Sequence, residues 1–88
     1  MLDKGIFMRL ILQYKTNVGT FYIGQSDDGR FHPIFNNESL GSYDKIWQAT
    51  EDLAIGTTLS VLHPETNEFI DTSEIDIPYE PSEWEKLI

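Results

Sequence analysis

The chain has 88 residues, a formal net charge of −9 and no cysteine. This length supports one modest hydrophobic core and excludes a second domain, and the lack of cysteine excludes disulfide bonds and thiolate chemistry. With 40% hydrophobic and 12% aromatic residues, the chain is too apolar to be intrinsically disordered. We expect one domain, with residues 1–5 flexible, a sheet-plus-helix core over residues 6–56 and an acidic segment over residues 57–88.

Two strands are predicted first. From Met8 onward, residues 6–15 alternate in the period of a half-buried strand, which places Leu10 and Leu12 on one face and Ile11 on the other. A turn over residues 16–19 leads to residues 20–25, which are rich in aromatic and β-branched side chains. These two runs are expected to form an antiparallel hairpin.

A third strand is predicted over residues 30–35, after a turn over residues 26–29 that ends in glycine. Pro33 has no amide hydrogen to donate, so this strand is expected at a sheet edge or with a bulge at Pro33. Ser39 and Leu40 add a further short strand to the prediction.

Residues 43–55 are predicted to form the main helix, capped at its start by Ser42 or Asp44 and ended by Gly56. Spacings of three and four place one set of side chains on its inner face. This set comprises Tyr43, Ile46, Trp47, Thr50, Leu53 and Ala54. Trp47 is therefore expected to lie over the sheet.

The remaining chain is predicted to contain a strand over residues 57–62, a turn at His63 and an extended, acidic path. Ser82 and Glu85 have the spacing of a capping box, which predicts a final short helix carrying Trp84. The predicted fold is α+β, in the order β-β-β-α-β. It consists of an antiparallel sheet of three to five strands, one main helix packed on one face, and an extended acidic C-terminal tail.

Residues 29–56, GRFHPIFNNESLGSYDKIWQATEDLAIG, combine a GR-aromatic strand, an LGSY segment and a helix with the pattern A-x-x-D-L-A-x-G. This order resembles that of a family of small uncharacterised bacterial proteins. Residues 75–84, IDIPYEPSEW, are similar to the IP…EW close of that family. The two stretches cover a little under half of the chain. The resemblance implies a small bacterial domain and assigns no activity, cofactor or functional residue.

The chemistry-bearing residues have structural explanations. His32 and His63 would need carboxylates such as Asp27 or Glu65 to hold a metal, but neither spacing matches a ligand pattern. Residues 26–29 read as a hairpin turn, because they lack the alternating oxygen ligands of a calcium loop. No nucleophile stands in an elbow or triad context. We expect no enzyme activity, no metal and no cofactor.

The charge is distributed unevenly along the chain. Residues 1–50 carry five acidic and five basic residues, whereas residues 51–88 carry ten acidic residues and only Lys86. Direct binding to nucleic acid is not expected, because it needs clustered lysine and arginine. The acidic half favours a partner with a basic surface, or serves solubility alone. The candidate interaction surface comprises Glu65, Glu68, Asp71, Glu74, Asp76, Glu80 and Glu83.

These observations favour a non-catalytic protein-interaction or regulatory module in the cytoplasm. A second copy of the chain is a further candidate partner, through the open sheet face or edge. The alternative is an acidic inhibitor that mimics nucleic acid and occupies the basic cleft of a DNA- or RNA-binding protein. No membrane segment is expected, since no run approaches the roughly 18 apolar residues of a membrane span.

Overall fold

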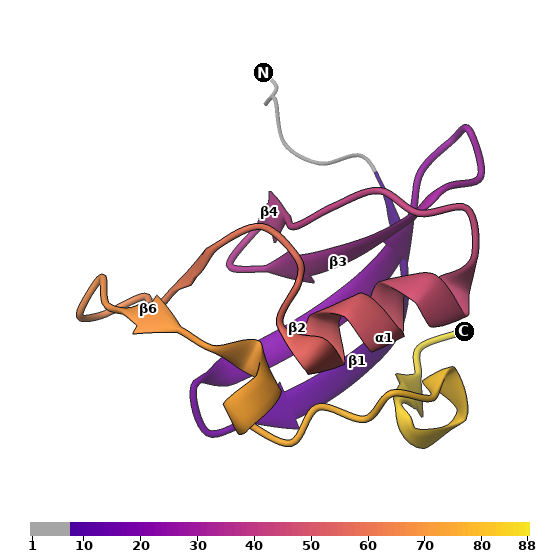
Figure 1. The fold of residues 1–88 in the computed structure, drawn as a ribbon. Helices are drawn as coiled ribbons and strands as arrows, with labels where there is room; N and C mark the ends of the chain where they lie inside the picture. Colours follow the sequence, from indigo (N-terminus) through magenta and orange to yellow (C-terminus); the bar gives the residue numbers. More distant parts are fainter. Residues whose placement is uncertain (1–7) are drawn as a thin grey trace.

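The computed structural model describes residues 8–88, so the predicted flexible residues 1–5 lie outside the described part. A five-stranded antiparallel sheet is covered on one face by a single helix (Figure 1). Its strands are β1 (Arg9–Thr16), β2 (Gly19–Gln25), β3 (Phe31–Phe35), β4 (Glu38–Ser39) and β7 (Glu85–Lys86), in the order β4-β3-β2-β1-β7. The helix is α1 (Ile46–Ile55). The predicted α+β fold is confirmed.

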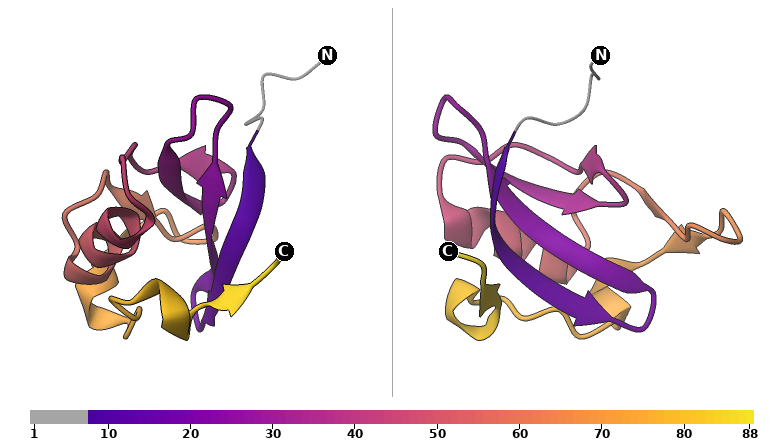
Figure 2. Two further views of the ribbon diagram at one scale, coloured as in Figure 1. Left: turned by 90° about the vertical axis from the view of Figure 1, so that its right-hand side faces the viewer. Right: turned by 180° about the vertical axis from the view of Figure 1, so that it is seen from behind.

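Smaller elements follow the helix. β5 (Val61–Leu62) and β6 (Phe69–Ile70) form a separate two-stranded sheet, and the 3-10 helices are η1 (Thr72–Glu74) and η2 (Pro81–Glu83). The β5–β6 turn extends away from the main body, whereas the last residues cross beneath α1 to the edge of the large sheet (Figures 1 and 2). The strand predicted over residues 57–62 is thus reduced to its last two residues.

The hydrophobic core lies between α1 and the sheet. Phe21, Ile23 and Leu53 have no exposed surface, and the rings of Phe21 and Phe35 stack with centroids 4.3 Å apart. Burying aromatic and branched side chains of this kind contributes roughly 1.5–3 kcal/mol each. The inward positions of three strands and one helix therefore supply most of the packing that stabilises this domain.

The alternation predicted for the first strand is wrong around Ile11. The register between β1 and β2 shifts between Leu10 and Leu12, which marks a bulge. Because a bulge interrupts the two-residue period, Ile11 and Leu12 are both buried, while Leu10 is partly exposed.

Pro33 lies in β3, the second strand from the edge. Phe31 exchanges both backbone hydrogen bonds with Tyr43, and the carbonyl of Pro33 accepts from the amide of Leu40 at 2.7 Å. Since these groups all point to the outer side of β3, the nitrogen of Pro33 also faces that side. On that side the pairing with β4, Leu40 and Tyr43 needs only the carbonyl of Pro33, so the missing amide of proline costs no ladder hydrogen bond.

The helix begins later than predicted. Ser42 and Asp44 do not cap it, because their side chains accept hydrogen bonds from the guanidinium of Arg30. Lys45 occupies the cap position, and its amide donates to the side-chain oxygen of Gln48 at 3.0 Å. The predicted end is confirmed, since Gly56 takes the left-handed conformation with φ 80°.

The position predicted for Trp47 is also wrong. The buried stripe of α1 is made by Ala49, Thr50, Leu53 and Ala54, whereas Trp47 is 52% exposed. The short side chains of the alanines let the helix approach the sheet closely, and the indole lies outside this contact. Trp47 therefore contributes little to the core.

The predicted final helix is replaced by η2 and β7. Trp84 is 4% exposed, its ring lies 5.8 Å from that of Tyr14, and its indole N–H donates to the carbonyl of Pro78 at 3.2 Å. Beyond it, Gln13 and Glu85 are register partners of β1 and β7, and their side chains form a 2.7 Å hydrogen bond. The edge of β1 supplies hydrogen-bond partners for the backbone of β7. A helix of about three residues would leave most of its backbone groups without partners.

Tyr43 gives a testable pH dependence. Burial, together with the nearby carboxylate of Asp52, raises the pKa of Tyr43 from its ordinary value of 10.0 to about 12. Because the folded state holds the phenol protonated more tightly than the unfolded state, this contribution is complete below pH 10 and is lost between about pH 10 and pH 12.

An absorbance titration of the phenols should show one ionisation near pH 12 that is missing in Tyr43→Phe. The wild-type free energy of unfolding should also fall more steeply above pH 10 than that of the variant. Superimposable curves for the two proteins would contradict the assignment.

Candidate functional site

The structure divides the seven predicted acidic residues into three groups. Two lie in the β5–β6 turn, two border η1, and three line a hollow beside α1. The first group is Glu65 and Glu68, the second is Asp71 and Glu74, and the third is Asp76, Glu80 and Glu83. The β5–β6 turn and η2 lie at opposite sides of the molecule (Figure 1). The third group is therefore the one that the fold brings together beside a hollow.

Asp71 has a local structural role. Its carboxylate accepts from the hydroxyl of Ser73 at 2.6 Å and from the amide of Ser73 at 3.0 Å, which caps η1. These hydrogen bonds to Ser73 lower the pKa of Asp71. The carboxylate is thus already engaged in capping η1.

Two neighbouring hollows meet at Tyr79. One, of about 390 Å³, is lined by Asp76, Tyr79, Glu80 and Glu83 among others. The other, of about 370 Å³, is lined by Trp47, Glu51, Tyr79, Glu80 and Pro81. Because Tyr79 and Glu80 line both, the two hollows adjoin and are treated as one surface. We call it the acidic-aromatic surface and define it by Trp47, Glu51, Asp76, Tyr79, Glu80 and Glu83.

This surface is held in place by buried polar contacts. Thr50 has no exposed surface, and its hydroxyl donates to the carbonyl of Tyr79 at 2.7 Å. The neighbouring carbonyl of Pro78 accepts from the buried indole of Trp84 at 3.2 Å. Pro78 and Pro81 restrict the backbone on either side of Tyr79. The loop that carries Tyr79 is therefore fixed to α1 before any partner binds.

The sequence prediction included Asp76, Glu80 and Glu83 but missed the helical half of the surface. Trp47 and Glu51 lie four residues apart and so share one face of α1. This spacing is a sequence signal for a shared face, but the predicted core position of Trp47 argues against it, because a buried tryptophan cannot contact a partner.

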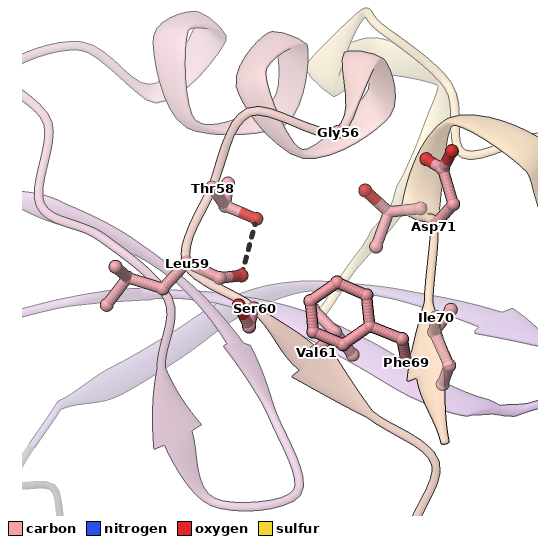
Figure 3. A pocket seen from close by; sticks show the side chains of 9 residues that line it. Gly56, Thr58, Leu59, Ser60, Val61, Phe69, Ile70 and Asp71 are labelled. Atoms are coloured by element: carbon pink, nitrogen blue, oxygen red, sulfur yellow. Dashed lines mark hydrogen bonds between the residues drawn. The ribbon is translucent and has the colours of Figure 1, made fainter.

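A further hollow, of about 340 Å³, lies between the end of α1 and the β5–β6 sheet (Figure 3). Its rim is apolar, with Leu59 66% and Phe69 71% exposed. Asp71 is the single titratable residue that lines it, within the described chain, and its carboxylate caps η1. Among the described residues, the hollow therefore brings no second ionisable group beside Asp71.

The two histidines are occupied by local contacts. The ring nitrogens of His32 lie 3.1 Å from the hydroxyls of Ser26, just after β2, and Ser39 in β4. The ring of His63 accepts from the amide of Glu65 at 3.1 Å within the turn. Over residues 8–88, no group of three histidine, aspartate or glutamate side chains is placed to hold a metal ion.

Comparisons with known proteins return no relative for this chain. No protein-family model matches it, and neither the curated proteins nor the solved structures contain a significant match. The bacterial-family resemblance of residues 29–56 and 75–84 therefore stays a prediction. Within residues 8–88, no helix is long and apolar enough to cross a membrane.

Proposed function

We propose that this protein is a non-catalytic interaction module that binds the basic surface of a protein partner through its acidic-aromatic surface. One observation carries the proposal. Trp47 and Tyr79, which are 52% and 61% exposed, lie among carboxylates from two separate segments. None of the residues that line the two hollows, all within the described chain, is basic.

The combination of residues suits protein recognition. Tryptophan and tyrosine are enriched at interfaces, because each buries a large apolar ring and keeps one polar group for a hydrogen bond. Carboxylates around them attract a positively charged partner and disfavour a negatively charged one. The net charge of −9 extends this attraction to longer range at low salt.

Mimicry of nucleic acid is the weaker alternative. It would need the acidic side chains to form a continuous row on one face, like backbone phosphates. The division of the predicted carboxylates between the β5–β6 turn, η1 and the hollow beside α1 gives such a row less support.

The test compares two variants that change the net charge equally. The site variant carries Glu51→Gln, Glu80→Gln and Glu83→Gln, and the control carries Glu65→Gln, Glu68→Gln and Glu74→Gln. A partner is captured from lysate with the wild type, identified by mass spectrometry, purified and titrated against both variants. At physiological salt, where exposed charges are screened beyond about 8 Å, we expect the site variant to bind about tenfold more weakly and the control to change binding less than about twofold.

If both variants lose the same affinity for the partner, binding depends only on net charge, and the proposed site is wrong. A partner without a basic surface, whose binding is unchanged by added salt, would overturn the proposed function itself. Displacement of the partner by DNA or RNA, with the control losing as much affinity as the site variant, would favour mimicry.

A further inference from the structure

We propose that the hollow between Trp47 and Tyr79 binds the side chain of a single arginine from the partner. We call this space the Trp47–Tyr79 hollow. The inference rests on the proposed function and adds the chemical group that the surface recognises. We infer arginine because two aromatic residues and two carboxylates line the hollow.

The walls come from two segments of the chain. Trp47 and Glu51 project from the first turns of α1, whereas Tyr79 and Glu80 precede η2 and Pro81 is its first residue. The space between them is about 370 Å³ and open to solvent, and both rings are more than half exposed. A side chain entering from a partner would therefore meet aromatic surface and carboxylates at the same time.

The chemistry of these walls selects a cation. A purely apolar group would cover Glu51 and Glu80 without pairing their charges, which is costly. An anion would be repelled by the same carboxylates. A cation gains from both, because aromatic rings attract positive charge and carboxylates pair with it.

Between the two common cations, the walls favour arginine over lysine. The guanidinium is planar, stacks on aromatic rings and donates two parallel hydrogen bonds to one carboxylate. The ammonium of lysine is a compact charge that holds its water more strongly. An arginine in this hollow can stack on the rings and pair with the carboxylates at the same time. A lysine would contribute mainly its charge.

The hollow is already formed in the free protein. The carbonyl of Tyr79 is held by the hydroxyl of Thr50, and Trp47 stands on a regular helix. Little conformational entropy of the loop is therefore lost on binding, which raises affinity. Core packing does not explain a tryptophan at this position, since Trp47 is 52% exposed and lies outside the buried stripe of α1.

The test uses three short peptides of glycine and serine that differ at one central residue, which is arginine, lysine or citrulline. Citrulline keeps the shape of arginine and loses its charge. The readout is the indole N–H resonance of Trp47 in the ¹⁵N-labelled protein, followed by NMR at low salt. The protein has two tryptophans, and Trp84 is buried, so it serves as an internal reference.

We expect the arginine peptide to shift the Trp47 resonance and leave that of Trp84 in place. The lysine peptide should bind about two- to fivefold more weakly, and citrulline still more weakly, in line with the size of exposed cation–π contacts. Trp47→Ala and Tyr79→Ala should each weaken arginine binding about two- to fivefold, measured from amide resonances.

Two matched controls separate this site from general effects. Ile55→Ala removes another exposed apolar side chain of α1, and Glu68→Gln removes one charge from the distant β5–β6 turn; both should leave arginine binding within about 1.5-fold. Equal binding of arginine and citrulline peptides, or unchanged binding in Trp47→Ala, would overturn the arginine site. The proposed function would survive that result if the triple carboxylate variant still lost its protein partner.

Discussion

Replacing Trp84 with alanine is expected to lower the free energy of unfolding by about 3–5 kcal/mol. The side chain is 4% exposed, packs against the ring of Tyr14 and donates its indole hydrogen to Pro78. Truncation leaves a cavity and an unpaired carbonyl, and it weakens the attachment of β7 to β1. A domain of 88 residues has roughly 4–13 kcal/mol of stability, so the loss is a large part of the total.

Urea unfolding followed by circular dichroism measures this loss, with Trp47→Ala as the control. Trp47 is 52% exposed, so its truncation should change the free energy of unfolding by less than about 0.5 kcal/mol. If Trp84→Ala does not fold, Trp84→Phe keeps most of the packing and loses only the hydrogen bond, which costs about 1–3 kcal/mol. Similar losses in Trp47→Ala and Trp84→Ala would contradict the burial of these two rings.

Thr50→Val is expected to lower the free energy of unfolding by about 1–3 kcal/mol and also to weaken binding at the acidic-aromatic surface. Thr50 has no exposed surface, and its hydroxyl donates to the carbonyl of Tyr79. Valine has nearly the same shape but cannot donate, so the carbonyl loses its partner and the Tyr79 segment is less firmly held. Chemical unfolding and titration with the arginine peptide measure the two effects separately.

Thr72→Val is the matched control. The hydroxyl of Thr72 is buried and donates to the carbonyl of Leu53 near the end of α1, away from the two rings. Its loss should cost a similar free energy of unfolding and leave peptide binding unchanged. Equal weakening of binding in Thr50→Val and Thr72→Val would indicate that the surface responds to overall stability and not to the position of Tyr79.

Prediction succeeded where a pattern has a local cause. The first hairpin follows from alternating side chains and a turn, and the end of α1 follows from Gly56, which adopts φ 80° without the strain of a side chain. Prediction failed where a distant contact overrode a local pattern. Ser42 and Asp44 have the composition of helix caps, but Arg30, just before β3, binds both. A contact across twelve or more residues cannot be read from a neighbouring pattern.

The candidate site shows the same division. The acidic composition of residues 51–88 follows from the sequence alone. The expectation of a basic partner follows from that composition. Which carboxylates gather beside a hollow was decided by the tertiary structure, because the buried Thr50 and Trp84 fix the Tyr79 segment against α1. Side-chain periodicity placed Trp47 near the core, and only the close packing of small side chains on the sheet left its ring exposed.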